Sequence, residues 1–200
     1  PACLVVTNSF DGGEGSLRAA IECANSHPGV DTITFAIPGD GPHHIGIVTP
    51  LPAITEAVVI DGFSQTGSRP NGLSADGNDA VIKIVLDGVE AGYRLEGASR
   101  VVKDGIPVRD IVDALVLRAD GCRVQGLDIQ RFPGVGIAVE SSHNQIQGNF
   151  IGTDADGVTP AGNSRMGIDI RGGHENRIGG LLAADVNRIA FNQDVGVRVT

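Results

Sequence analysis

Two aspartates, Asp128 and Asp169, are the side chains of this sequence most suited to acid–base chemistry. Each lies between two aliphatic residues in a short run, and such alternation places the polar residue on the outer face of a strand. Glu140 follows a similar run. Two outward carboxyl groups on neighbouring strands would suit cleavage or epimerisation of a polysaccharide, with Arg131 or Arg171 acting as a base or neutralising a uronate. The alternative is a row of solvated charges without chemistry.

A group of basic residues in the middle of the chain forms a second candidate, a ligand-binding strip. Only Arg18 and Arg69 precede Lys83 among the basic residues. We expect residues 89–113 to be an inserted loop, and loops carry function more often than regular elements do. Its candidate binding residues are Tyr93, Arg94, Arg100, Lys103 and Arg109. They would bind an acidic glycan or a protein partner; scattered, solvated arginines are the alternative.

Metal binding has weaker support. Asp154-Ala155-Asp156-Gly157 resembles the start of a calcium loop, but no Asp or Asn stands at the next ligand step and no Glu closes the loop. A turn is the alternative for Asp154 and Asp156. His143 and His174 fall at corresponding places before asparagines, where polar turn residues are expected, and their spacing is not that of a metal motif. We therefore expect no cofactor, with calcium as the alternative.

The composition excludes several classes of function. The 200 residues carry a formal net charge of −9, which argues against nucleic acid and anionic membranes as partners. No apolar run approaches the roughly 20 residues that a membrane helix needs, so we expect no transmembrane segment. Hydrophobic residues make up 41% and aromatic residues only 4%, and 29 residues are glycine. This combination predicts an aliphatic core with many turns.

The elements that must position these side chains follow a repeat. Its first strand residues, Leu115, Ile137, Ile168 and Val197, are 22, 31 and 29 residues apart. In each unit a second apolar strand residue follows after 9 or 10 positions, and a third after 5 or 11 more. Short strands at this spacing, with no helical periodicity between them, predict a solenoid with three strands per coil.

The repeat register specifies one continuous core with asparagines at its corners. Asparagine tolerates left-handed backbone and can bond locally, so we expect Asn149 and Asn192 to occupy matching corners. The residues predicted to point into the core are Ile137, Val139, Ile146, Ile151, Ile168, Ile170, Ile178, Ile189 and Val197.

The first 30 residues predict a cap for this solenoid. Ser16 is a good N-cap for a short helix that Pro28-Gly29 would stop. The apolar face of the helix consists of Leu17, Ala20, Ile21 and Ala24. A helix of this kind would cover the apolar end of the first coil. Cys3 and Cys23 would form a disulfide if strand and helix meet; a free pair is equally open, and Cys122 is left over.

Several motifs resemble one family of proteins. Val5–Asn8, Gly15–Ile21 and Asp31–Phe35 are similar to the N-terminal cap of bacterial exported proteins that carry a Cys-Ser-Leu-Arg-Glu-Ala motif, although Gly15 replaces the motif Cys and Ala19 its Glu. Three further segments resemble the right-handed parallel β-helix of the same proteins, which belong to the pectin-lyase-like superfamily: Val59–Gln65, Ile146–Asp154 and Asn176–Gly180. The resemblance implies an all-β, right-handed single-stranded parallel β-helix with a short capping α-helix. It also implies a secreted or cell-surface location.

We predict a single domain over residues 1–200. It would consist of the cap (1–30), irregular early coils with insertions (31–112) and regular coils (113–200), with long loops at 64–78 and 89–113. Because the last strand starts a coil that is not completed, we expect a fragment of a longer chain. Its open C-terminal coil would contact the rest of that chain or another copy.

Two hypotheses for the function remain. The first is a non-catalytic module of an exported or cell-surface bacterial protein, serving as a stalk or as a surface that binds a polysaccharide or a protein. The alternative is a carbohydrate-active enzyme, a lyase, hydrolase or epimerase, that works on an outer face through Asp128, Asp169 and Arg131. Such folds host both classes, so the fold alone does not choose between them.

Overall fold

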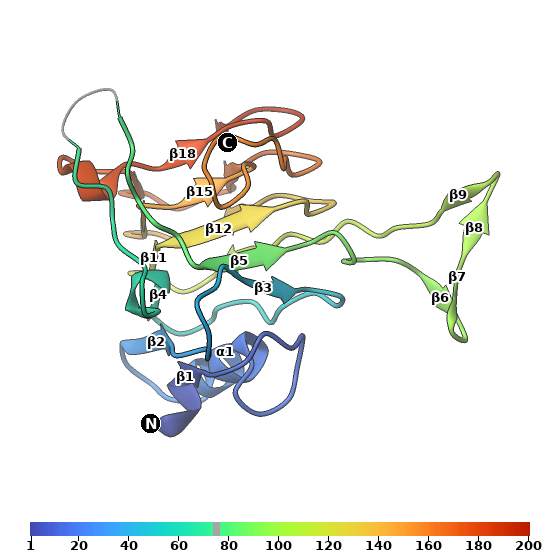
Figure 1. The fold of residues 1–200 in the computed structure, drawn as a ribbon, viewed down its shortest axis with the longest axis horizontal. Helices are drawn as coiled ribbons and strands as arrows, with labels where there is room; N and C mark the ends of the chain where they lie inside the picture. Colours follow the sequence, from blue (N-terminus) through green and yellow to red (C-terminus); the bar gives the residue numbers. More distant parts are fainter. Residues whose placement is uncertain (74–76) are drawn as a thin grey trace.

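The computed structural model describes residues 1–73 and 77–200, whose regular secondary structure is mainly β-strand, chiefly in three parallel sheets (Figure 1). The first sheet consists, in spatial order, of β1 (Val5–Val6), β2 (Asp31–Phe35), β4 (Val58–Asp61), β11 (Arg123–Gln125), β14 (Gln145–Gln147) and β17 (Arg177–Ile178). The second sheet consists of β10 (Leu115–Leu117), β13 (Ile137–Val139), β16 (Ile168–Ile170) and β19 (Val197–Val199). The third sheet consists of β18 (Arg188–Ile189), β15 (Phe150–Ile151), β12 (Leu127–Gln130), β5 (Ile84–Asp87) and β3 (His43–Gly46).

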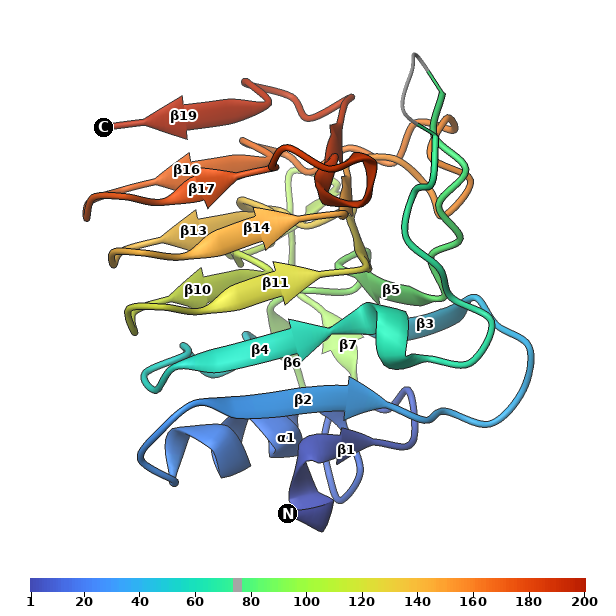
Figure 2. The ribbon, with the colours of Figure 1, turned by 90° about the vertical axis from the view of Figure 1, so that its left-hand side faces the viewer.

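From β10 onward the chain visits the three sheets in a fixed order. Strands β10, β11 and β12 lie in the second, first and third sheet, and the triplets β13 to β15 and β16 to β18 repeat this order. We call each such triplet a coil. Figure 2 shows the coils as stacked layers, with the N-terminal segment at one end and β19 at the other. The predicted three strands per coil are confirmed for this part of the chain.

The strand pairing confirms the predicted register. Ile137 pairs with Leu115 on one side and with Ile168 on the other, and Ile168 pairs with Val197. The second and third strands keep the same alignment, for example Ile146 with Ile178 and Ile151 with Ile189. The period-2 spacing of the aliphatic residues was therefore sufficient to align the coils.

The predicted core is confirmed except at its last coil. Six of the nine predicted residues are buried: Ile137, Val139, Ile146, Ile151, Ile168 and Ile170. Ile178 and Ile189 are only half-buried, although both pack against the core. Val197 is 42% exposed, so its predicted burial is wrong. The reason is that β19 is an edge strand, with a partner strand on one side only.

The corner asparagines act through their side-chain amides. The Asn149 Oδ1 accepts a bond from the Leu127 backbone N–H of the preceding coil at 3.0 Å, and the Asn187 Oδ1 accepts from the Asn149 N–H at 3.0 Å. Asn192 instead accepts from Asn163. The predicted match of Asn149 with Asn192 is therefore wrong, because in the third coil Asn187 takes the place of Asn149 and Asn192 that of Asn163.

Left-handed backbone is not what selects asparagine at these corners. The residues other than glycine with positive φ in the described part of the chain are Asp104, Arg131, His143, Glu175 and Phe191. The value of asparagine lies in an amide that accepts from one backbone group and donates to another.

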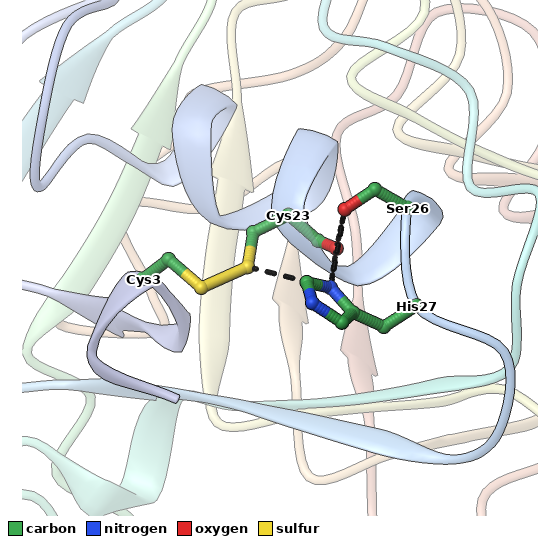
Figure 3. The surroundings of a disulfide bond; sticks show 4 residues. All are labelled: Cys3, Cys23, Ser26 and His27. Atoms are coloured by element: carbon green, nitrogen blue, oxygen red, sulfur yellow. Dashed lines mark hydrogen bonds between the residues drawn. A yellow bond between two sulfur atoms is a disulfide. The ribbon is translucent and has the colours of Figure 1, made fainter.

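The helix predicted for the N-terminal segment forms as expected. Helix α1 (Leu17–Asn25) begins after Ser16, whose hydroxyl accepts a bond from the Ala19 N–H at 3.2 Å. All four residues of the predicted apolar face are buried. A disulfide joins Cys3 to Cys23 and ties the short 3-10 helix η1 (Ala2–Leu4) to α1 (Figure 3). Cys122 is free and buried, as the odd cysteine was predicted to be left over.

Residues 89–112, which we call the arm, leave the sheets and return (Figure 1). The arm holds two consecutive antiparallel hairpins, one made of β6 (Leu95–Glu96) and β7 (Ser99–Arg100) and the next of β8 (Val102–Lys103) and β9 (Ile106–Pro107). The predicted insertion at 89–113 is thus confirmed. The predicted loop at 64–78 begins with the 3-10 helix η2 (Gly62–Ser64), and its residues 74–76 lie outside the described residues.

One further short element completes the description. The 3-10 helix η3 (Ala183–Asp185) lies in the loop between β17 and β18. Among the described residues, no helix has both the length and the apolar character needed to cross a membrane.

Candidate functional site at the base of the arm

The base of the arm is held by an ion pair between two strands of the third sheet. Asp87 ends β5 and is buried, and it pairs in register with Gln130 at the end of β12. Arg131 follows in a left-handed conformation, with φ of 60°, which turns its guanidinium back toward Asp87. The Arg131 Nε lies 3.0 Å from the Asp87 Oδ1, and the Arg131 Nη2 bonds the other carboxylate oxygen. Such a two-point contact fixes the orientation of both groups.

Asp87 has two more neighbours. Its Oδ1 accepts a bond from the Val89 N–H at 3.0 Å, and the His44 Nδ1 lies 3.6 Å from its Oδ2. The carboxylate therefore determines the direction in which the arm leaves the sheet. Arg131, one of the three catalytic candidates, is committed to this contact.

Arg109 closes the base of the arm from its returning side. Its Nε donates to the Ala91 carbonyl at 2.6 Å, and its Nη2 donates to the Val89 carbonyl at 3.1 Å and to that of Gly88. The carbonyls of a loop that leaves a sheet have no strand partner, so one guanidinium satisfies several of them. Arg109 is thus first a structural clamp.

Two guanidinium groups lie close to the Tyr93 ring. The Arg100 Cζ is 3.9 Å from the centre of the Tyr93 ring and the Arg109 Cζ is 4.9 Å from it. Both distances are within the range of cation–π attraction. Arg100 also pairs with Glu90. Three of the predicted binding residues therefore form one cluster, which sequence reasoning expected only as a strip.

The other two predicted binding residues are placed differently. Arg94 forms an ion pair with Asp110 at 2.5 Å, and its hydrogen bond lowers the pKa of the Asp110 carboxyl. Lys103 is exposed on β8 in the second hairpin, and none of the cluster contacts involves it. The structure thus brings Tyr93, Arg100 and Arg109 together and leaves Arg94 and Lys103 apart from them.

Asp128 is not the exposed acid that its outward position predicted. It alternates with the core residues Leu127 and Ile129, yet its own exposed fraction is 0%. Neither carboxylate oxygen has a hydrogen-bond partner in the described part of the chain. Burial raises the pKa of Asp128 to about 9, and the negative charge of Asp154 contributes in the same direction.

A loop of the next coil accounts for this burial. Residues 153–160 fold back on themselves, with a bond from the Asp154 N–H to the Thr159 carbonyl at 2.8 Å. Gly157 of this loop lies so close to the Phe150 ring that an added Cβ would come within 2.8 Å of it. Phe150 is the strand partner of Asp128. The loop therefore covers this part of the outer face, so that no surface is left at Asp128 for a polymer to approach.

Asp169 is also buried, but it is fully paired. Its exposed fraction is 0%, and it accepts bonds from Arg198 at 2.7 Å and from Arg171 at 2.8 Å. These contacts, with that of Arg198 the largest, lower the pKa of the Asp169 carboxyl. Asp169 and Asp128 belong to the second and third sheets respectively. The structure does not bring them together as an acid–base pair.

The outer face of the second sheet is instead a ladder of charges. Arg171 also contacts Asp113 at 2.7 Å and Glu140 at 3.3 Å, and Glu140 contacts Arg118 at 2.9 Å. Opposite charges alternate along this face from coil to coil. The row-of-charges alternative therefore describes Glu140 and Arg171 better than the catalytic one, and Asp169 belongs to the same row but is buried.

The two candidate calcium ligands are engaged in a turn. The Asp154 Oδ1 accepts from the Ala155 N–H at 2.7 Å. Asp156 accepts from the N–H groups of Val158 and Thr159 and from the Thr159 hydroxyl, which is the largest cause of the lowered pKa of Asp156. This is the bonding pattern of the turn alternative.

The corners hold one cluster that sequence reasoning missed. His143, His174 and Glu175 lie together on two stacked coils, whereas the histidines were predicted only as polar turn residues. The 31-residue separation of the two histidines equals the step from Ile137 to Ile168, and this was the available signal. No such signal pointed to Glu175, because its position depends on how the backbone turns at the corner.

No protein-family model matches this sequence, and no curated protein matches it either.

Proposed function

We propose that this chain is a non-catalytic module of an exported or cell-surface protein, with a stack of coils as scaffold and the arm as its contact element. We further propose that the three sheets form a right-handed single-stranded parallel β-helix with an N-terminal cap. The repeated strand order, the register and the capping helix support that fold. The resemblance to exported proteins with a Cys-Ser-Leu-Arg-Glu-Ala motif agrees with it.

Export is supported by the disulfide between Cys3 and Cys23. Disulfides persist in oxidising compartments and are rare in the cytosol. A bond that ties the first turn of the cap to α1 fits a protein that works outside the cell.

The main support for a contact role is the set of residue types that the arm exposes. Leu95, Val102 and Ile106 are more than half exposed on its two hairpins, next to the cluster of Tyr93 with Arg100 and Arg109. Tyrosine and arginine with exposed aliphatic residues are typical of protein interfaces. The guanidinium groups of Arg100 and Arg109 are already bonded to Glu90 and to carbonyls, which leaves less capacity for an acidic glycan. A protein partner is therefore favoured over a polysaccharide.

A photo-crosslinking residue at Val102 tests this proposal in cells that produce the protein. We expect one discrete, protease-sensitive adduct from Val102 and none from the same residue placed at Arg118, an exposed control position directly after β10. A protease-resistant, glycosidase-sensitive adduct would favour a polysaccharide. The absence of any adduct at Val102, Leu95 and Ile106 would contradict a contact role for the arm.

The enzyme alternative is tested separately with purified protein. We expect no new reducing ends and no unsaturated uronate when the chain is incubated with polygalacturonate, alginate and neutral glycans. Turnover that Asp128→Asn or Asp169→Asn abolishes, in variants that remain folded, would overturn the non-catalytic role.

We also propose that the exposed apolar surface at the last coil is a contact surface. Its exposed apolar residues are Leu181, Leu182, Val186, Phe191, Val195, Val197 and Val199. Exposed strand edges beside apolar surface promote association. Analytical ultracentrifugation of the 200 residues should show concentration-dependent self-association, and a strict monomer at every concentration would contradict an adhesive end.

A further inference from the structure

Two stacked corners on the edge between the second and first sheets bring three metal-binding side chains together. The corner between β13 and β14 carries His143, and the corner between β16 and β17 carries His174 and Glu175. The His143 N–H donates to the His174 carbonyl at 3.0 Å. The coil stacking thus makes neighbours of residues that are about 30 positions apart.

The side chains of these residues converge. The His143 Nδ1 lies 3.1 Å from the Glu175 Oε2, and the two imidazole rings meet edge to face with centroids 5.0 Å apart. One ligand atom from each residue lies within 4.8 Å of the other two. All three residues are exposed, so water can reach the same point.

The backbone beneath the cluster is held firmly. The buried Asn144 donates to the Asn176 Oδ1 through its backbone N–H at 3.0 Å and through its side chain at 2.9 Å. The Ser142 Oγ accepts from the His174 N–H at 3.2 Å. The corners approach so closely that a Cβ on Gly173 would come within 2.0 Å of the Ser141 carbonyl oxygen. A site on fixed backbone requires little reorganisation to bind.

His143 and Glu175 share an uncommon conformation. Their φ angles are 59° and 57°, in the left-handed region that residues other than glycine seldom adopt. This conformation directs both side chains away from their strands and toward the same point. The two corners present their ligands in a matching way.

We propose that His143, His174 and Glu175 bind a divalent cation of the zinc type. Two imidazole nitrogens and one carboxylate oxygen are a common zinc donor set, with a water in the fourth position. Calcium and magnesium prefer oxygen ligands and are disfavoured here. Tetrahedral zinc with bonds of about 2.0–2.1 Å needs donor atoms roughly 3.3 Å apart. The donor atoms now lie within 4.8 Å of one another, and small rotations of these exposed side chains bring them to the required distance.

The bound ion would clip two coils together at the surface. It would link the second and third coils at a corner already joined by asparagine bonds, and anything that binds only the folded state stabilises that state. This inference does not depend on the role of the arm.

Isothermal titration of the metal-free, tag-free chain with zinc chloride tests the site. We expect one ion per chain, with the affinity lowered about tenfold or more by His143→Ala and by His174→Ala, since each removes a ligand. Glu175→Gln keeps the size of the side chain and should weaken binding as well. His27→Ala removes an exposed histidine beyond the C-terminal end of α1 and should leave the affinity unchanged.

A second measurement reports the coordination of the bound ion. Cobalt(II) bound by the chain should show the visible absorption of a four-coordinate site, and the two histidine variants should lose it while retaining the far-UV circular dichroism of the parent. Zinc binding that is absent, or that the His27 and His143 variants reduce equally, would overturn the proposal. Bound cobalt without the absorption of a four-coordinate site would do the same.

Discussion

The outer faces of the second and third sheets each carry an aspartate in the middle of a strand, Asp169 on β16 and Asp128 on β12. Both have an exposed fraction of 0%, and both alternate with core aliphatic residues. Asp169 is bonded by two guanidinium groups, and its pKa is lowered. Asp128 has no partner in the described residues, and burial raises its pKa to about 9. An outward position on a strand therefore does not determine whether a carboxyl group is charged.

The difference arises from what covers each face. On the second sheet, the guanidinium groups of Arg171 and Arg198 lie against Asp169 and pair with its negative charge. The third sheet is covered by the loop over residues 153–160. Among the described residues, neither this loop nor any other group donates a hydrogen bond to the Asp128 carboxylate. Desolvation disfavours a carboxylate, and only a partner can compensate for it.

The largest expected effect is a loss of stability on truncating the core. It tests whether the second and third sheets share one hydrophobic core. Ile168→Ala beneath the second sheet and Ile129→Ala beneath the third should each lower the free energy of unfolding by about 2 to 5 kcal/mol, because both side chains are fully buried. Urea unfolding measures both. If only one truncation is costly, the difference between the faces extends into the core.

Removing the charge of the paired aspartate should destabilise the chain. Asp169→Asn loses charged hydrogen bonds to Arg171 and Arg198, and we expect a loss of about 1.5 to 3 kcal/mol at pH 7. A lowered pKa means that this stabilisation is present above the ordinary value of 3.8 and is lost as the pH falls through the folded-state pKa. Urea unfolding at pH 7 and below pH 4 should show the difference shrink. An equal loss at both pH values would contradict pairing.

Removing the charge of the unpaired aspartate should have the opposite sign. Asp128→Asn should raise the free energy of unfolding at pH 7 by about 1 to 2 kcal/mol, because no buried carboxylate or proton uptake is then required. A raised pKa means that the contribution of Asp128 is full below pH 3.8 and declines as the pH rises toward about 9. The advantage of Asp128→Asn over the parent should therefore grow between pH 4 and pH 9. Thermal unfolding across this range is the measurement, and a pH-independent difference would show that Asp128 has a partner.

The smallest effect concerns the exposed end of the charge ladder. Glu140→Gln removes the contacts to Arg118 and Arg171, both of which are partly solvated, and should cost less than about 1 kcal/mol. Added salt should reduce the cost further. A larger, salt-independent loss would mean that the ladder acts as one buried network.

The sequence predicted best those features that follow from short residue patterns, such as strand alternation and helix capping. Alternation of aliphatic residues aligned Ile137 with Ile168, and Ser16 with the apolar face after it placed the helix of the cap. The exposure of Asp128 could not be predicted in the same way, because it depends on a loop of the next coil that folds back over Phe150. The cluster of Tyr93 with two arginines likewise depends on how the arm returns to its base.

The corner asparagines have a consequence for how such a chain changes during evolution. The Asn163 amide accepts from the Phe132 N–H and donates to the Ile129 carbonyl, so that each coil is positioned by a bond across the stack and not by the length of the preceding loop. Equivalent strand residues are 22 or 31 residues apart, yet they remain in the same pairing. Insertions between a strand and its corner asparagine are therefore absorbed where they occur. The loop over residues 153–160 lies in such a place, and new surface can be added there without a compensating change in the core.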